Sequence, residues 1–238
     1  YSRLVNVLLD SMGSYFATTH EDEPGVGIEN ASDVMNLAGP ESRWAIVTNN
    51  GRENLNSLDL RLPEGYKFTV SLDPFGAIAI PFDMKLPGGQ VLDYSSLMPL
   101  GLFGSGEKPL FVLHGPAGTT GELSVDGKKM QLSVPDNDTL NLFEHQGQAF
   151  CAINTDLAMR TWPIDDELIF GPEFVGDTLD DLYHAKNTKQ YFIYSLEEKK
   201  LQIKKLKPAN TSKPTAPRLS AWKRICICPE PISKDLTW

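Results

Sequence analysis

Residues 76–134 carry the pattern that most constrains the fold of this chain. Short runs of β-branched, leucine and aromatic residues alternate with polar ones, and Gly, Pro or Asp-Gly interrupts them about every ten residues. This rhythm is typical of an antiparallel β-sandwich or barrel, in which each interruption is a turn. The clearest unit is 122–134, where Asp126 and Gly127 supply the positive φ angles of a tight hairpin turn. We predict that its buried side chains are Leu123, Val125, Met130, Leu132 and Val134.

The apolar segment 110–115 is followed by a Gly-rich turn, which raises the question of a phosphate-binding loop. Such a loop needs a Lys directly after its last Gly and a helix whose N-terminus completes the phosphate cradle. Here Thr119 and Thr120 follow Gly118, and the next residues alternate like a strand. We therefore predict a β-turn at this position instead of a nucleotide site.

The charge balance narrows the class of partner. The chain has 238 residues, with 22 basic against 31 acidic side chains and a net charge of -9. Nucleic acids and anionic membranes both need a basic face on the protein, so we expect neither as a partner. No apolar run reaches the roughly eighteen residues of a membrane-spanning helix. An uncharged sugar remains compatible with this composition.

Cysteine and histidine give no pattern for a disulfide framework or a metal site. Cys226 and Cys228 alternate on one predicted strand, so their side chains point to opposite faces. The histidines are scattered along the chain, without the spacing of metal ligands. We interpret Cys151, Cys226 and Cys228 as small apolar strand residues, and we expect no metal and no cofactor.

The N-terminal segment 2–16 is predicted to form an amphipathic helix. Its apolar residues fall on one stripe at helical spacing, and they are Leu4, Val5, Leu8, Leu9, Met12 and Phe16. Residues 18–40 are predicted to form a loop, with a helical turn at 31–37 that Ser32 or Asp33 could cap. Because residue 1 is a Tyr within the helical pattern, we expect the sequence to be a piece of a longer protein.

Strand patterns continue from residue 43 to residue 206. The last two, 190–196 and 200–206, are predicted to form a hairpin with Ile203 and Leu206 facing the core. A Pro-rich linker with no apolar period follows at 207–217. We therefore predict a mostly β chain, an antiparallel β-sandwich with one N-terminal helix and a C-terminal Pro-rich linker, divided at 1–39, 40–207 and 208–238.

The order of these motifs resembles the β region that follows the catalytic barrel in bacterial glycoside hydrolase family 35, the β-galactosidases. The residues that carry the resemblance are Asn49, Asn50, Pro81, Phe82, Gly88, Gly89, Tyr94 and the segment 115–122. The helix at 2–16 is similar to the last helix of that barrel. The closing segment 228–238 is similar to the passage toward the family's next β domain.

The resemblance implies a protein whose catalytic residues lie outside this chain. In that family, two glutamates at the ends of barrel strands act as acid/base and nucleophile, about 5 Å apart. No position of this chain matches them, so the chain alone is expected to be inactive. The implied partner is the catalytic barrel of the same polypeptide, with an oligosaccharide as the second expected partner. The family also favours a periplasmic or extracellular location.

Several side chains are candidates for sugar binding, because flat aromatic rings cover the apolar face of a pyranose. Trp162, Trp44 and Tyr94 are the aromatic candidates, with Trp222 beyond the linker, and Glu122 is the polar one. Core packing is the alternative for each ring, and a turn histidine bound to its neighbours is the alternative to a proton-transfer role for His114. Trp162 is of most interest, because it precedes Pro163 at a strand end beside an acidic loop.

An acidic pair for hydrolysis is the other candidate site. It would join Glu122 to a carboxylate near Asp165 across a cleft, whereas the alternative is a set of solvated turn and strand-end carboxylates. The residues considered are Asp83, Glu122, Asp165, Asp166, Glu167 and Glu173.

Three functions are thus open. The leading hypothesis is a non-catalytic β domain of a β-galactosidase-like glycoside hydrolase that packs against the catalytic barrel. The alternative is an independent carbohydrate-binding module. A small hydrolase in its own right is the third.

Overall fold

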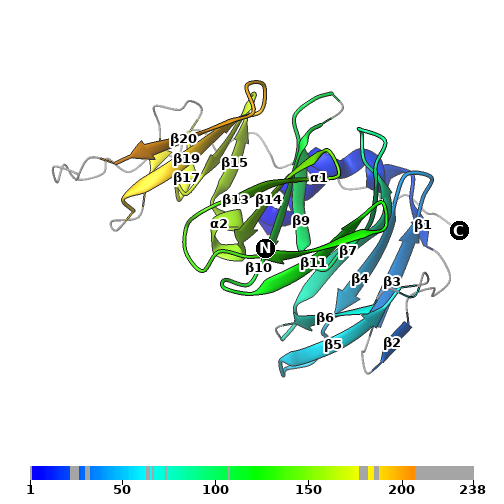
Figure 1. Cartoon of the computed structure of the whole chain (residues 1–238). Coiled ribbons are helices and arrows are strands. Elements are labelled where there is room, and N and C mark those ends of the chain that lie inside the picture. The colour runs from blue at the N-terminus through cyan, green and yellow to red at the C-terminus, as the bar shows by residue number, and fades with distance from the viewer. Residues whose placement is uncertain are drawn as a thin grey trace, which may run out of the picture. The chain divides into compact units, whose positions relative to one another are not determined.

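The computed structural model describes residues 2–21, 27–29, 33–62, 65, 67–72, 74–106, 108–176, 182–184 and 188–206. Contacts divide the chain into a compact unit, Tyr1–Leu206, and a second unit, Lys207–Trp238, which lies outside the described residues. The predicted linker, Cys226, Cys228 and Trp222 therefore also lie outside them. Within the described part, the protein is mostly β with antiparallel sheets and an N-terminal helix, which confirms the predicted fold class (Figure 1).

The largest sheet has seven strands, and every neighbouring pair in it is antiparallel. In spatial order these are β1 (His20–Glu21), β3 (Asp33–Ala38), β4 (Arg43–Thr48), β7 (Ala77–Lys85), β8 (Val91–Ser95), β11 (Thr120–Val125) and β12 (Lys128–Ser133). The predicted hairpin of β11 and β12 is confirmed, with φ angles of 50° at Asp126 and 72° at Gly127. Four of the five predicted side chains are buried, and Met130 is half-buried.

The prediction of a helical turn at 31–37 is wrong, because β3 occupies most of that segment. Val34 pairs with Val47 and Met35 with Ile46 across the ladder between β3 and β4. The ladder satisfies backbone groups on both strands, and this tertiary gain outweighs the weak local preference for a helical turn.

A four-stranded sheet forms the central layer of the protein. Its order is β13 (Asn141–His145), β14 (Gln148–Asn154), β10 (Leu110–Gly115) and β9 (Met98–Phe103). One face carries Phe111 and Phe150, which pack with Leu92 and Leu123 of the seven-stranded sheet. β10 and β14 are parallel, and every residue of β10 is buried. A strand covered on both faces is apolar throughout, which explains the continuous run at 110–113.

The opposite face of this central layer is covered by two helices and a third sheet. Val112 and Ile153 on that face pack with Leu168 and Phe192. The third sheet has the order β15 (Thr161–Ile164), β16 (Glu167–Phe170), β19 (Gln190–Ser195) and β20 (Lys200–Lys205). Two smaller groups complete the described strands: β17 (Phe174–Val175) with β18 (Leu182–Tyr183), and β2 (Gly27–Glu29) with β5 (Leu55–Arg61) and β6 (Lys67–Leu72).

The predicted final hairpin is confirmed as β19 and β20, but Ile203 does not lie in the core. Ile203 stands opposite the buried Phe192, yet its side chain is 57% exposed. β20 is the outer strand of the third sheet in the described part of the chain, so the core does not extend over it. Leu206 is half-buried.

The N-terminal helix α1 (Ser2–Ala17) is confirmed, but its buried stripe is rotated from the predicted one. Leu4 and Val7 pack in one core with Phe103, and Met12 packs in the other core with Trp44. Val5 and Leu9, predicted on the apolar stripe, are 51% and 46% exposed. Leu4, Val7 and Met12 are buried and Leu8 is half-buried, and this helical spacing marks the face that α1 lays on β9. No helix in the described part of the chain is long and apolar enough to span a membrane.

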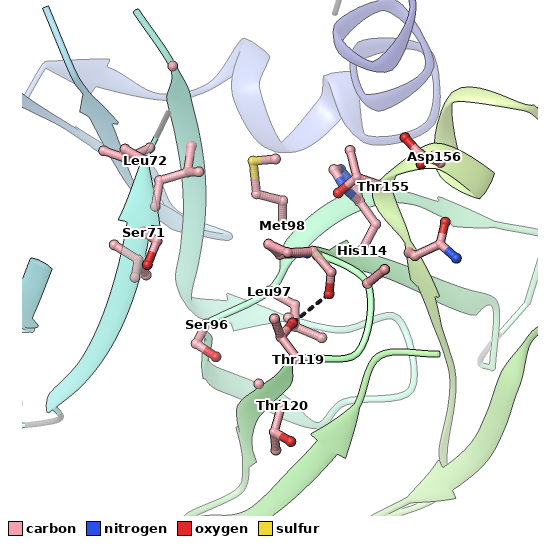
Figure 2. Close-up of a pocket in the computed structure, with 18 of the residues that line it drawn as sticks. Ser71, Leu72, Ser96, Leu97, Met98, His114, Thr119, Thr120, Thr155 and Asp156 are labelled. Atoms are coloured by element: carbon pink, nitrogen blue, oxygen red, sulfur yellow. Dashed lines mark hydrogen bonds between the residues drawn. The ribbon is translucent and has the colours of Figure 1, made fainter. Parts of the chain in front are cut away.

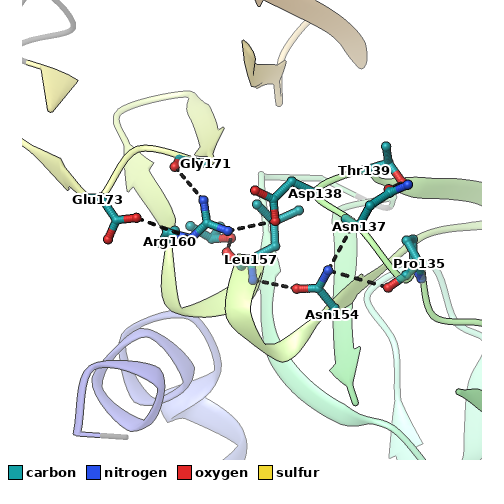
Figure 3. A network of polar contacts seen from close by, with 10 residues as sticks. Pro135, Asn137, Asp138, Thr139, Asn154, Leu157, Arg160, Gly171 and Glu173 are labelled. Atoms are coloured by element: carbon teal, nitrogen blue, oxygen red, sulfur yellow. Dashed lines mark hydrogen bonds and ion pairs between the residues drawn. The ribbon is translucent and has the colours of Figure 1, made fainter. Parts of the chain in front are cut away.

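The short helix α2 (Thr155–Met159) lies within the region 43–206, where only strand patterns were predicted. The Asn154 carboxamide oxygen accepts a hydrogen bond from the Leu157 backbone N–H at 2.7 Å and caps the helix. The same side chain donates to the backbone carbonyl of Asn137 at 2.8 Å (Figure 3). This cap fixes α2 at the end of β14.

Candidate functional site

Trp44 packs in the core and presents no ring face to a sugar. Its side chain is fully buried on β4, and its ring stacks on Phe16 of α1 with 4.2 Å between the ring centroids. The indole N–H donates to the Ser42 hydroxyl at 2.9 Å. Core packing therefore replaces the sugar-stacking interpretation, because the neighbouring strands and α1 cover the ring.

Tyr94 and Glu122 form a hydrogen bond between neighbouring strands, and neither residue lines the cavity described below. The Tyr94 ring is buried in the seven-stranded sheet, and its hydroxyl bonds the Glu122 carboxylate. Lys129 and Gln131 of β12 donate to the same carboxylate at 3.3 and 3.2 Å. Burial, with the hydrogen bond to Glu122, raises the pKa of Tyr94 to about 12. These contacts tie β8, β11 and β12 together.

The other candidate carboxylates lie in a turn, in ion pairs or, for Glu167, at the start of β16. Asp165 and Asp166 form the turn between β15 and β16, in a different sheet from Glu122. Asp83 pairs with Arg43 at 3.4 Å, and Glu173 lies 3.9 Å from Arg160. This arrangement favours the interpretation as solvated turn and strand-end carboxylates.

Trp162 is half-buried, and one face of its ring is occupied. The Arg3 guanidinium of α1 lies over the ring, 3.3 Å from its centroid, and also donates to the backbone carbonyls of Met159 and Thr161. The indole N–H donates to the Pro172 carbonyl at 3.0 Å. Partial burial lowers the pKa of Arg3 to about 10, which leaves it charged at neutral pH.

Two exposed rings that the sequence analysis missed lie beside Trp162. Phe174 meets it edge to face at 5.7 Å between centroids, and Tyr183 lies 5.8 Å beyond Phe174. Phe174 and Tyr183 are cross-strand partners on β17 and β18, with 48% and 39% of their surface exposed. We call Trp162, Phe174 and Tyr183 the aromatic surface. No sequence pattern predicts the pairing of Phe174 with Tyr183, because an acidic segment without strand alternation separates the two residues in the sequence.

A cavity of about 540 Å³ lies where the chain crosses between the seven-stranded sheet and the central four-stranded sheet (Figure 2). β8 of the large sheet leads to β9 of the central one, and β10 leads back to β11. The walls come from β6, from these two crossings and from α2. Leu97 and Met98 lie at its centre in Figure 2.

Two glycines make room for Leu97 in this wall. A Cβ on Gly115 would lie 2.8 Å from the Leu97 side chain, and one on Gly121 would lie 2.4 Å from it. The Leu97 side chain therefore packs directly against the backbone of Gly115 and Gly121, at the two ends of the turn between β10 and β11. This close approach gives a packing reason for the Gly-rich segment, which the structure shows as the predicted turn.

His114 is one of two buried polar residues among the described ones that line this cavity, with Asn154 the other. The His114 side chain is 2% exposed at the end of β10, and Nδ1 lies 3.3 Å from the Thr155 hydroxyl (Figure 2). Burial lowers the pKa of His114 to about 4, so the imidazole is neutral at pH 7. A neutral imidazole has one donor and one acceptor nitrogen, and Thr155 contacts one of them.

A polar network holds α2 in place beside the cavity. Arg160, which follows α2, pairs with Asp138 at 2.7 Å and donates to the Gly171 carbonyl at 2.9 Å (Figure 3). These contacts join α2 to the segment before β13 and to the third sheet. The network positions Thr155 and Asp156 on the cavity wall.

Comparison with models of known protein families found no match, and comparison with curated proteins found none either. Within the described ranges, no group of three or more His, Cys, Asp or Glu side chains is arranged to hold a metal ion. Cys151 is buried and unpaired on β14, as a small apolar residue, and burial raises the pKa of its thiol.

Proposed function

We propose that this chain is a non-catalytic β domain of a β-galactosidase-like glycoside hydrolase. It packs against the catalytic barrel of the same polypeptide and shapes the substrate cleft. One observation carries the non-catalytic part of the proposal: among the described residues that line the cavity, Asp156 is the one carboxylate. Retaining hydrolysis needs two carboxyl groups about 5 Å apart across the bound sugar.

The fold and the helix α1 support a packing role. A mostly β unit with an N-terminal helix is what the family resemblance predicts for this region. α1 buries one stripe in the two cores and leaves Val5 and Leu9 on its outer side, where they are about half exposed. Apolar side chains on an outer helix face suit contact with a neighbouring domain.

The test is an activity assay joined to the sequence of the gene on both sides of the chain. Purified chain is expected to give no turnover of aryl β-galactosides. The flanking gene is expected to encode about 200 or more residues of alternating strands and helices with two glutamates at strand ends. Turnover that Glu122→Gln or Glu167→Gln abolishes would overturn the non-catalytic role. Flanking sequence that encodes no such barrel would contradict the proposal that the chain belongs to a glycoside hydrolase.

The aromatic surface supports a second candidate, an independent carbohydrate-binding module. Exposed rings of Phe174 and Tyr183 beside Trp162 provide apolar area onto which a pyranose could stack. The candidate predicts saturable binding of oligosaccharides that Phe174→Ala weakens while the thermal unfolding curve stays unchanged. A glycan array without signal for the purified chain would exclude it.

A further inference from the structure

The cavity has the size and the mixed lining of a small-molecule site. Its volume of about 540 Å³ falls within the roughly 300–1,000 Å³ that such sites occupy. Apolar side chains form the bed, with Leu97 and Met98 at the centre and Leu72 on one side (Figure 2). A bed of this kind suits the C–H face of a sugar ring, although no Phe, Tyr or Trp side chain is among the described residues that line it.

Polar groups without protein partners surround this bed. In the part of the chain that the structure describes, the Ser71 and Thr120 hydroxyls and the Asp156 carboxylate form no hydrogen bond or ion pair. Figure 2 shows them on three different sides of Met98: Ser71 on β6, Thr120 at the start of β11, and Asp156 on α2. Groups spaced around an apolar centre can bond several hydroxyls of one ring at once.

Charge selects among polar ligands. The cavity lining includes neither Lys nor Arg among the described residues, and Asp156 is its one acidic side chain. An anionic ligand would bring its charge to a carboxylate that has no Lys or Arg with it in the described lining, and this like-charge contact disfavours binding. Neutral hydroxyl groups, in contrast, donate well to a carboxylate.

We propose that this cavity binds a neutral saccharide of one or two rings, with Asp156 accepting hydroxyl hydrogen bonds and excluding acidic sugars. The choice of galactosides as probes rests on the proposed function. The inference that the cavity binds a ligand depends only on the size and lining of the cavity. Without ring stacking, we expect a dissociation constant of about 1–10 mM for methyl β-galactoside or lactose.

The methionines give a direct readout. Met98 and Met159 line the cavity, whereas Met35 is an exposed residue of β3 outside its lining. The whole chain is labelled with 13C at the methionine methyl groups, signals are assigned with Met→Leu variants, and methyl β-galactoside is titrated. We expect saturable shifts of Met98 and Met159 with Met35 unmoved, and at least tenfold weaker binding of galacturonate.

Two variants and a control test the assignment. Ala117→Trp, on the exposed turn that lines the mouth, is expected to abolish the shifts, whereas Ser105→Trp, on an exposed turn outside the lining, leaves them unchanged. Asp156→Asn is expected to weaken galactoside binding about fivefold and to reduce the preference over galacturonate about tenfold, because the like-charge contact is lost.

Each result decides between the inference and the proposed function. No shift of Met98 or Met159 with any neutral sugar, or equal binding of galacturonate, overturns the inference and leaves the accessory-domain proposal standing. Sugar-dependent shifts in a chain whose gene encodes no barrel preserve the inference and overturn the proposed function. Shifts that appear only when the barrel is added identify the cavity as a domain contact, and they also overturn the inference.

Discussion

The two ends of α1 meet a tryptophan in opposite ways. Near its C-terminus, the half-buried Phe16 stacks on the fully buried Trp44 of the large sheet. Near its N-terminus, Arg3 lies over the half-buried Trp162 of the third sheet. One contact is dry and apolar, and the other joins a cation to a ring beside solvent. The comparison shows that one helix can link two sheets through contacts of different chemical kinds.

Truncating each of the two tryptophans is expected to give the largest difference in the free energy of unfolding. Trp44→Ala removes a fully buried indole, and such losses cost about 3–5 kcal/mol. Trp162→Ala should cost about 1–2 kcal/mol, because its ring is half-buried and part of its stabilisation is a cation–π contact. Urea unfolding of both variants gives the difference. Equal losses would mean that the two ends of α1 contribute alike.

Acid is expected to act through His114 on β10, at the cavity end of the central sheet, more than on the third sheet. The His114 pKa is about 4 in the folded protein against an ordinary 6.5, so the unfolded state binds the proton more readily between those values. Stability from this group is therefore full above about pH 6.5 and falls by about 3 kcal/mol as the pH drops to 4. His184 also has a lowered pKa, through partial burial.

The measurement is urea unfolding between pH 7 and pH 4 for the wild-type chain, His114→Leu and His184→Leu. His114→Leu should remove most of the loss on acidification, whereas His184→Leu should change the slope less. A slope that His114→Leu leaves unchanged would contradict the assignment of acid sensitivity to this buried imidazole.

Removing the cation should loosen the contact between the N-terminal end of α1 and the third sheet. Arg3→Ala gives up the contact over Trp162 and the hydrogen bonds to the Met159 and Thr161 carbonyls, and we expect a loss of about 1–2 kcal/mol. Amide hydrogen exchange should quicken in β15 and β16 while β4 and β7 keep their protection. Arg3→Lys serves as the matched control for charge, and full rescue by it would show that the planar guanidinium is unimportant.

The smallest effect belongs to the aromatic surface. Phe174→Ala should change the free energy of unfolding by less than about 0.5 kcal/mol, since the ring is about half exposed on a two-stranded ladder. Differential scanning calorimetry can compare it with Phe192→Ala, which truncates a buried residue of the neighbouring sheet. A large loss for Phe174→Ala would place its ring in the core of the protein.

Local patterns predicted much of this fold. The turn at Asp126 and Gly127, the strands on either side and the helix at 2–16 depend on residues near one another in sequence, and all were confirmed. The segment 33–38 was missed because its strand character depends on pairing with β4, which the segment itself does not encode. The rotation of the buried stripe of α1 was missed because Val5 and Val7 are the same residue type. Only the tertiary contacts of Val7 make it the buried one of the two.

The candidate sites were harder to predict, for the same reason. Trp44 and Trp162 both follow strand-like patterns, and only the stacking of Phe16 on one and Arg3 on the other separates a core ring from a surface ring. The cavity assembles β6, two sheet crossings and α2, whose contacts span long separations in the chain. His114 was noted as a candidate, but its burial depends on those same contacts.

Among the described residues β20 is the outer strand of the third sheet, and this has a consequence for how the protein behaves in concentrated solution. β20 bears Lys200, Lys204 and Lys205, all exposed, beside the exposed Ile203. An open sheet edge can pair with the edge of another molecule and seed fibres, and lysines along it oppose that pairing by charge repulsion. Raising the salt concentration would screen this repulsion, so the shelf life of a purified sample should depend on ionic strength.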